Sequence, residues 1–274
     1  MRIYLFNDDE GEASADSRYW AFMVMGKYES GMGQTPIYYI FTYDKEQDKI
    51  VGILTTRPVA SENSYPLGIK PNFVDISPDG RKVLASWGWK SSTTGLSGSI
   101  YDGPHVYNLN FTNPIKVGGG TKHSGWAFDY EGNQVFVQSW TGDYITATNV
   151  ETGEQIKIIH HTDFGGWDVH WHFSRIYNSE IKGWIMMSLY DSDYNEWADN
   201  QILMLEIKPK EENPRIWRIT HSYGLRGVGG FSSPKAALNW QGNKIFWSSN
   251  WKSTSVSEVY QAVLPENWWE DLKE

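Results

Sequence analysis

The amino-acid sequence predicts an all-β fold built from repeated four-stranded antiparallel units, and three observations lead to it. The 274 residues include 15 Trp, 16 Tyr, 11 Phe and 26 Gly, a composition that favours strands and turns over long helices. The stretch DISPDGRKVLASW (75–87) places a Ser-Pro-Asp-Gly turn between two alternating apolar runs, which is typical of a β-hairpin. The same pattern then recurs along the chain.

The recurrence sets the architecture. Copies aligned on the turn occupy residues 13–24, 75–87, 127–140 and 237–251, and residues 172–190 form a further copy with a longer turn. Four of these are followed by a second pair of apolar runs around a polar turn, at 37–54, 105–119, 144–159 and 201–220. Four strands per repeating unit predict a β-propeller, in which blades pack radially because one sheet cannot bury both of its faces alone.

We expect one propeller domain over residues 1–274, with five visible blades at 8–56, 70–119, 122–161, 166–221 and 231–265. The last unit has no clear fourth strand, and residues 2–7 are expected to fill that place. Two arrangements remain open: a closed five-bladed ring, and five blades of a larger propeller. A closed ring leaves no strand edge bare.

The Ser-Pro-Asp-Gly turn after a short apolar strand, as in DISPDGRKVLASW, resembles the repeat of the TolB-type, WD40-like propellers. The stretches ASADSRYW and FDYEGNQVFV are looser versions of it. The resemblance implies the propeller architecture. This repeat occurs in binding scaffolds, peptidase accessory domains and polysaccharide lyases, so the function has to be argued from the site.

Composition and charge exclude several classes of protein. The net charge of −9 argues against a nucleic-acid binder, because phosphate binding needs a basic surface. No apolar run of about 18 residues predicts a membrane-spanning helix. Without Cys there is no disulfide, thiolate metal site or thiol nucleophile. Nucleophile-elbow, Walker and H-E-x-x-H motifs are absent, so neither a serine hydrolase nor an NTPase is expected.

The cellular compartment stays open. The first six residues, MRIYLF, lack the apolar length and cleavage site of a secretory signal. An extracellular or periplasmic location is favoured if the sequence is a mature or trimmed form, and a cytosolic one otherwise.

One mouth of the propeller is expected to collect the functional side chains, because the loops before the innermost strands and after the second strands share a face. Aromatic planes beside hydrogen-bonding groups suit a sugar, although a Trp at a strand end can instead pack between blades. The expected ligand-binding residues are Asn72, Trp87, Trp89, Trp140, Asp168, Lys235, Asn250 and Trp251.

The stretch WDVHWHF (167–173) is the most specific local signal. Strand alternation puts Asp168, His170 and His172 on one face. Two His residues two positions apart on a strand can chelate a divalent metal ion, with His123 of the neighbouring blade as third ligand. Histidines that only hydrogen-bond within the structure are the alternative, and the cofactor is therefore either a divalent metal ion or none.

The leading functional hypothesis is cleavage of a uronic-acid-containing glycan by β-elimination. That reaction needs a base, a group that neutralises the uronate carboxylate, and an acid at the leaving oxygen. The candidates are His123 or His170 as base, Tyr190 as acid, and Arg226, Lys235 or a His-bound metal as neutraliser. These residue types resemble those of the propeller polysaccharide lyases of the oligogalacturonate and ulvan lyase type, which implies an acidic polysaccharide or oligosaccharide as partner.

The alternative hypothesis is a non-catalytic propeller that binds a glycan or a protein partner, or that serves as an assembly subunit. The tail PENWWEDLKE (265–274) would then dock on the partner, or cap the last blade. The two hypotheses differ in whether titratable side chains meet within hydrogen-bonding distance at the mouth.

Overall fold

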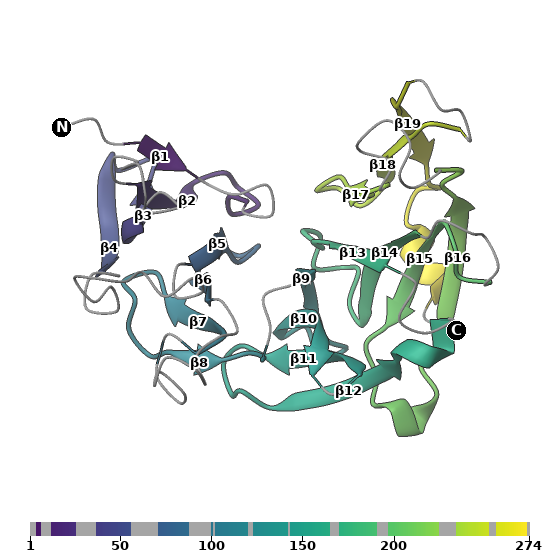
Figure 1. Cartoon of the computed structure of the whole chain (residues 1–274), viewed down its shortest axis with the longest axis horizontal. Coiled ribbons are helices and arrows are strands. Elements are labelled where there is room, and N and C mark those ends of the chain that lie inside the picture. Colours follow the sequence, from purple (N-terminus) through teal and green to yellow (C-terminus); the bar gives the residue numbers. More distant parts are fainter. Residues whose placement is uncertain are drawn as a thin grey trace, which may run out of the picture. The chain divides into compact units, whose positions relative to one another are not determined.

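The computed structural model describes residues 4–6, 12–25, 37–55, 71–87, 100, 102–119, 123–141, 143–164, 170–190, 197–224, 234–251 and 256–272. In these residues the regular elements are antiparallel strands and short 3₁₀ helices (Figure 1). No helix in the described ranges has the length and apolar character to cross a membrane. The chain forms two compact units, one of residues Met1–Thr121 with Val150–Gly153, the other of Lys122–Asn149 with Glu154–Glu274.

The first unit contains two four-stranded sheets. One sheet has the order β1 (Tyr4–Phe6), β2 (Tyr19–Met25), β3 (Ile37–Asp44) and β4 (Lys49–Thr55). The other has the order β5 (Pro71–Ile76), β6 (Lys82–Trp87), β7 (Pro104–Asn108) and β8 (Ile115–Lys116). Their core consists of the buried side chains Ala21, Met23, Ile40, Val74, Ile76, Val83, Ala85, Trp87 and Tyr107.

The second unit contains the remaining strands. One run pairs β9 (Ser124–Phe128), β10 (Gln134–Thr141), β11 (Tyr144–Asn149) and β12 (Gln155–His160), and another pairs β13 (His170–Ser174), β14 (Trp184–Tyr190), β15 (Gln201–Glu206) and β16 (Ile216–His221). A three-stranded sheet follows, with β17 (Ala237–Leu238), β18 (Lys244–Ser249) and β19 (Glu258–Val263). The 3₁₀ helices are η2 (His161–Phe164), η3 (Lys210–Glu212) and η4 (Trp268–Leu272).

The repeated turn has the same hydrogen bonds in four places. The carbonyl of its first residue accepts a bond from the N–H three positions later, at 2.8–3.1 Å; the pairs are Ser14 with Ser17, Ser77 with Gly80, Asp129 with Gly132 and Asn239 with Gly242. The second member of each pair has a positive φ, between 58° and 86°. The side-chain oxygen of the first residue also accepts an N–H at the start of the next strand. The sequence repeat is therefore a repeat of one local hydrogen-bonded structure.

The placement of the first strand differs from the expectation. Residues 2–7 were expected to complete the last blade, but β1 pairs with β2, in the register Tyr4 with Met25 and Phe6 with Met23. The strand therefore belongs to the first sheet, because the chain needs only one loop to bring it beside β2. In the described residues the last sheet has three strands. The number of blades in the intact propeller stays a prediction.

Candidate functional site

Two paired strands position the histidine motif. In the β13–β14 register, His170 lies opposite Tyr190 and His172 opposite Ser188. Trp171 points to the other side of β13 and is buried in the core. Because side chains alternate along a strand, His172 and Tyr190 share the opposite face of this sheet. The alternation predicted from WDVHWHF is thus present in the strand.

Three of the predicted site residues meet in one chain of contacts. His123 Nδ1 lies 3.2 Å from His172 Nδ1, and the two rings are nearly perpendicular with centroids 4.4 Å apart. His172 Nε2 lies 3.3 Å from the Tyr190 hydroxyl oxygen, and these two rings stack with centroids 5.6 Å apart. His172 therefore joins His123 at one nitrogen and Tyr190 at the other.

A glycine allows this meeting. His123 precedes β9, and Gly125 follows two residues later; a Cβ added at Gly125 would lie 3.0 Å from the Phe173 Cβ of β13. The absence of that Cβ lets β9 approach β13 closely enough for the two histidine rings to touch. Their contact thus depends on Gly125, a residue that has no side chain of its own.

Backbone strain marks three of the predicted residues. His123 has φ 39°, Lys235 has φ 35° and Trp251 has φ 47°, all in the left-handed region that non-glycine residues rarely adopt. His123 lies directly before β9, and Lys235 lies two residues before the first residue of β17. Such a conformation costs of order 1–3 kcal/mol and persists where surrounding contacts enforce it, which happens often at functional sites.

The face that carries His172 also anchors the segment before β17. Ser188 Oγ accepts a hydrogen bond from the Ala236 N–H at 3.1 Å, and Ser174 Oγ accepts one from the Leu238 N–H at 2.9 Å. Lys235 is the residue directly before the first of these contacts. The segment of Lys235 is therefore fixed on the same sheet face as His172.

Other predicted residues have different surroundings. Trp87 is fully buried in the core of the first unit, so it has no face open to a sugar. This burial corrects the expectation that Trp87 binds a ligand. Its strand β6 is buried along its whole length, which makes this Trp a packing residue. Asn250 is also buried, whereas Trp251 is 52% exposed and stands between Tyr223 and Tyr260, at 4.4 and 5.0 Å between centroids.

Several predicted residues lie outside the described part of the chain. These are Trp89, Asp168 and Arg226, together with the side chains of Asn72, Trp140 and His170. Among the described side chains, no group of three or more His, Cys, Asp or Glu residues is arranged to hold a metal ion. The expected metal site of His123, His170 and His172 stays a prediction, because it includes one of the side chains outside that part.

The donor geometry of the two described histidines fits a metal ion. Two nitrogens bound in cis positions to one divalent ion, each at about 2.1 Å, lie roughly 3.0–3.4 Å apart. The 3.2 Å between the Nδ1 atoms of His123 and His172 falls in this range. The same spacing is that of an ordinary hydrogen bond between one protonated and one unprotonated ring nitrogen.

Sequence reasoning missed a buried histidine behind the site. The His161 ring lies 4.7 Å from the Trp171 ring, on the core side of β13, and is almost wholly buried. Burial lowers the pKa of His161, and this effect outweighs the opposite one of Asp143. Ile158 and Ile159 are both buried at the end of the preceding strand, so no alternation in the sequence predicts that His161 is buried.

A buried ion pair also escaped the sequence reading. The carboxylate of Glu206 on β15 accepts hydrogen bonds from the Arg215 guanidinium at 3.0 and 3.2 Å and from the Tyr130 hydroxyl. Burial raises the pKa of Glu206, but the bonds from Arg215 and Tyr130 outweigh it and lower the pKa to about 2. Burial raises the pKa of Tyr130 to about 12, and Glu206 contributes to the increase. This network links β15 to the turn between β9 and β10 and to the segment before β16.

No family model and no curated protein matches the chain. Solved structures do. An oligogalacturonate lyase in complex with manganese matches with a TM-score of 0.53 at 14% identity, over 94% of this chain and 65% of that one. The β-propeller domain of the Trilobed protease from Pyrococcus furiosus matches with a TM-score of 0.50 at 10% identity, over 95% of this chain and 68% of that one.

TolB from Acinetobacter baumannii matches with a TM-score of 0.49 at 8% identity, over 92% of this chain and 50% of that one. The chain thus spans less than two thirds of the length of the manganese-bound lyase and half that of TolB. At such identities the likeness concerns the fold, and it confirms the predicted all-β propeller. The protein has a β-propeller fold, similar in architecture to the oligogalacturonate lyase and to the propeller domain of the Trilobed protease.

Proposed function

We propose that the protein is a polysaccharide lyase that cleaves uronic-acid-containing glycans by β-elimination. The observation that carries the proposal is the contact chain from His123 through His172 to Tyr190. These are three side chains able to accept or donate protons, in direct contact, on residues that the fold holds in a strained or paired backbone.

The reaction requires two proton transfers. A base removes the proton from C5 of the uronate, the electron pair forms the C4–C5 double bond, and the C4–O bond breaks as the leaving oxygen takes a proton. Tyr190 is suited to protonate the leaving oxygen, and His123 to take the C5 proton. In each turnover His123 gains one proton and Tyr190 loses one, so the two transfers balance.

His172 links His123 and Tyr190. Its ring accepts a proton at Nδ1 while releasing one at Nε2, so a proton from His123 can pass to Tyr190 through two hydrogen bonds, and proton exchange of the two rings with solvent then restores their starting tautomers. Loss of any member interrupts this path. His172 is in this account a positioning and relay residue, and the substrate meets His123 and the small part of Tyr190, 7% of its surface, that remains exposed.

The uronate carboxylate needs a neutralising charge, because removal of the C5 proton places further negative charge on it. Lys235 is the described candidate, since its segment is anchored on the same sheet face by Ser188 and Ser174. Arg226 is the candidate outside the described residues. A divalent ion held by His123, His172 and His170 would supply the same charge in an alternative account, in which the ion takes the place of the hydrogen bond between the two described nitrogens and of the relay through it.

The fold likeness to an oligogalacturonate lyase in complex with manganese supports the choice of substrate class and of the metal to test. The experiment follows the ultraviolet absorbance of the unsaturated uronate product, with pectate, ulvan and glycosaminoglycans as substrates. Each substrate is tested with added Mn²⁺ and with a chelator. We expect product from at least one of them.

Tyr190→Phe is the most informative variant, because it keeps the ring that stacks on His172 and removes only the hydroxyl. We expect its kcat to fall by about 100- to 10,000-fold. Tyr144→Phe, on β11 of the same unit, is the matched control and should keep the wild-type rate. An absence of product from every substrate, or full activity in Tyr190→Phe, would contradict the proposal; glycan binding without cleavage would identify a binding module instead.

A further inference from the structure

In the second unit a row of aromatic rings leads from the core to the surface. Trp247 of β18 is buried and stacks on Tyr260 of β19, at 6.0 Å between ring centroids. Tyr260 stacks in turn on Trp251 at 5.0 Å, and Trp251 lies against Tyr223 at 4.4 Å. The Nε1–H of Trp247 donates a hydrogen bond to the Ser222 carbonyl at 3.3 Å. The row therefore lies within one unit and is fixed to its core at the inner end.

The two outermost rings of the row remain open to solvent. Trp251 is 52% exposed and Tyr223 is 39% exposed. Their planes are tilted by 38°, and Trp251 is tilted by 28° against Tyr260, so neighbouring rings cover one another only in part. We call Tyr223 and Trp251 the aromatic pair. Unlike the buried Trp87, the aromatic pair presents ring carbons to a molecule that arrives from solvent.

Both residues of the aromatic pair have a strained backbone. Tyr223 has φ 53° and Trp251 has φ 47°, in the left-handed region that is unfavourable for bulky side chains. A local hydrogen bond fixes each residue: the Tyr223 N–H donates to His221 Nδ1, and the Trp251 N–H donates to Ser249 Oγ, both at 3.0 Å. Because the two rings stay exposed, burial does not repay this strain. Strain that is held in place without such a return is typical of functional sites.

The aromatic pair lies at the same end of its sheet as Tyr190. Strands β14 and β16 are both antiparallel to β15, so they run in the same direction. Tyr190 is the last residue of β14, His221 is the last residue of β16, and Tyr223 follows two positions later. The two strands are two strand spacings apart, which is about 10 Å. A short oligosaccharide along this end of the sheet therefore spans the distance from Tyr190 to the aromatic pair.

A sugar residue has the surface that suits the aromatic pair. Its ring presents a face of C–H groups that packs on aromatic carbons, while its hydroxyls exchange hydrogen bonds with groups at the ring edges. The Tyr223 hydroxyl and the Trp251 Nε1–H are such groups. A purely apolar ligand that covered the pair would leave both without a partner. The chemistry of the pair thus favours a sugar.

We propose that Tyr223 and Trp251 form a subsite that binds a sugar residue of the glycan, a few positions away from the bond that is cleaved. The proposal rests on the proposed lyase function, which supplies the glycan as substrate. The subsite contributes binding and takes no part in the proton transfers of His123 and Tyr190. Its effect should therefore grow with the length of the glycan.

Calorimetric titration with a disaccharide and a hexasaccharide of pectate, of ulvan and of hyaluronan tests the subsite without relying on turnover, in the Tyr190→Phe background. We expect at least one hexasaccharide to bind more tightly than its disaccharide. Trp251→Ala should weaken that hexasaccharide about 10-fold and Tyr223→Ala about 3- to 10-fold, because each removes a stacking surface. Binding of the disaccharide should change less than about two-fold, and Trp251→Phe should keep most of the affinity because it keeps an aromatic plane.

Trp240→Ala is the matched control. Trp240 belongs to the turn between β17 and β18, at the opposite end of β18 from Trp251, and is 53% exposed. Its replacement should leave binding of both oligosaccharides unchanged. Circular dichroism and thermal unfolding check that every variant is folded. An equal loss of affinity in Trp240→Ala and Trp251→Ala would overturn the proposal.

Steady-state kinetics separates the subsite from the lyase. With the lyase confirmed, Trp251→Ala should raise KM for the long glycan about 10-fold and keep kcat within about two-fold, because the subsite only binds. Cleavage with wild-type KM in both Trp251→Ala and Tyr223→Ala would overturn the subsite and leave the lyase standing. Hexasaccharide binding that Trp251→Ala weakens, without cleavage by the wild type, would contradict the lyase and support the subsite. An absence of binding to all three hexasaccharides would overturn both.

Discussion

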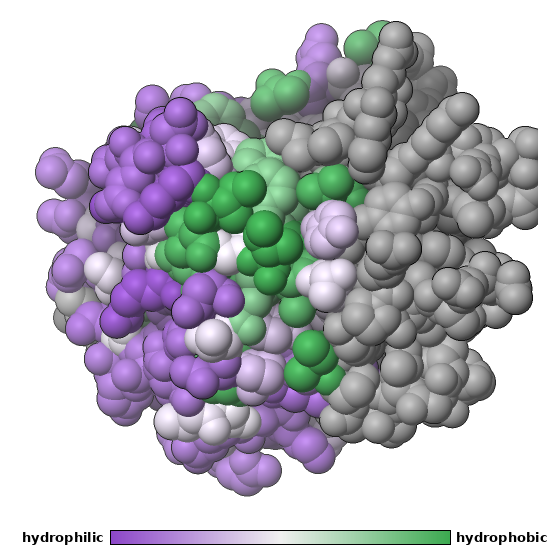
Figure 2. Space-filling model, turned by 90° about the vertical axis from the view of Figure 1, so that its left-hand side faces the viewer, coloured by the Kyte–Doolittle hydropathy of each residue, from purple (hydrophilic) through white to green (hydrophobic). Residues whose placement is uncertain are grey.

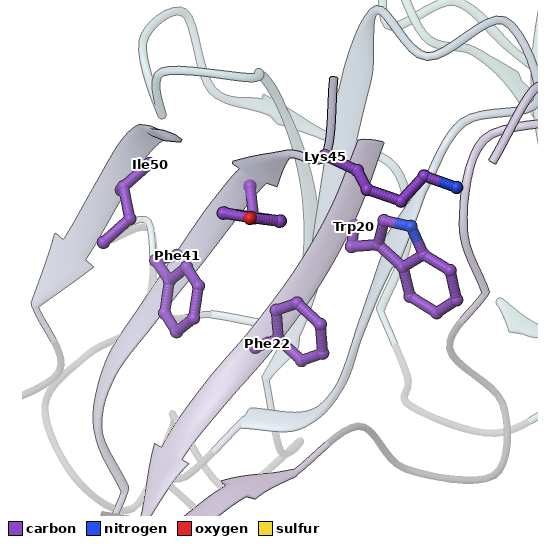
Figure 3. A pocket seen from close by; sticks show the side chains of 6 residues that line it. Trp20, Phe22, Phe41, Lys45 and Ile50 are labelled. Carbon is purple, nitrogen blue, oxygen red and sulfur yellow. The ribbon is translucent and has the colours of Figure 1, made fainter. Parts of the chain in front are cut away.

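Two sheet faces of this molecule differ sharply in chemistry, although both belong to antiparallel strand pairs. On the outer face of the first sheet, Trp20, Phe22, Phe41 and Ile53 present aromatic and aliphatic side chains (Figure 2). The first three of these line a groove of about 510 Å³ (Figure 3). The face of β13 and β14 presents His172, Ser174, Ser188 and Tyr190, and its two serines receive backbone N–H groups of the segment before and within β17. The first face can form packing contacts, whereas the second holds neighbouring backbone by hydrogen bonds.

The largest effect on activity is expected from removing either histidine of the His123–His172 pair. We expect His123→Ala and His172→Ala each to reduce kcat/KM by about 100- to 10,000-fold, because either change interrupts the path to Tyr190. The double variant should be little worse than each single one, since residues that act as a unit are not additive. Steady-state kinetics on the best substrate measures this, and additive losses would show that the two rings act separately.

The buried carboxylate of Glu206 comes next. Arg215→Met leaves this carboxylate with Lys208, Tyr130 and a backbone N–H as partners and should cost about 1–3 kcal/mol of unfolding free energy. Urea denaturation measures the loss. Arg81→Met, at an exposed turn pair with Asp79, is the control and should change stability by less than about 1 kcal/mol.

Acid pH should weaken the contacts of the Glu206 carboxylate. The pKa of Glu206 is lowered from 4.5 to about 2 in the folded protein, so its contribution to stability is fully present above pH 4.5 and is lost as the pH falls through 2. Glu206→Gln should flatten the decrease in unfolding free energy over this interval. Denaturation at several pH values checks it, and an unchanged slope would contradict the assignment.

The face of β13 and β14 also depends on single hydrogen bonds to the segment of Lys235. Ser188→Ala removes the acceptor of the Ala236 N–H and should cost about 1–3 kcal/mol, because that buried donor loses its partner. Since Lys235 precedes Ala236, we also expect KM for a uronate substrate to rise. Wild-type KM in a destabilised Ser188→Ala would separate the structural role from the substrate role.

The outer face of the first sheet should be the least sensitive to substitution. Ile53→Asp replaces a side chain that is 57% exposed, so it should change the unfolding free energy by no more than about 0.5 kcal/mol. Thermal unfolding of dilute protein measures this. A large loss would show that the face is packed within the monomer.

The sequence predicted the strands and turns well because their causes are local. Each turn begins with Ser, Asp or Asn and ends with a residue of positive φ. Both positions can be recognised in the sequence. The alternation in WDVHWHF likewise placed His172 and Trp171 on opposite sides of β13. The meeting of His172 with His123 was only a hypothesis, because it depends on two sheets and on the absence of a side chain at Gly125.

Two errors have the same origin. An apolar run predicts a strand but not the edge it pairs with, so residues 2–7 were assigned to the wrong sheet. A Trp at the end of a strand looks the same whether it faces a mouth or the core, and Trp87 faces the core. Both features depend on tertiary packing, which the periodic pattern of apolar residues in a single sequence does not reveal.

The pairing pattern of the strands has a consequence for how the chain folds. In the described residues every strand pair joins neighbours in sequence, apart from the single contact of β9 with β14. Each hairpin closes over a short loop, and such contacts form quickly because little chain entropy is lost. A growing polypeptide can therefore complete each sheet before the next is synthesised.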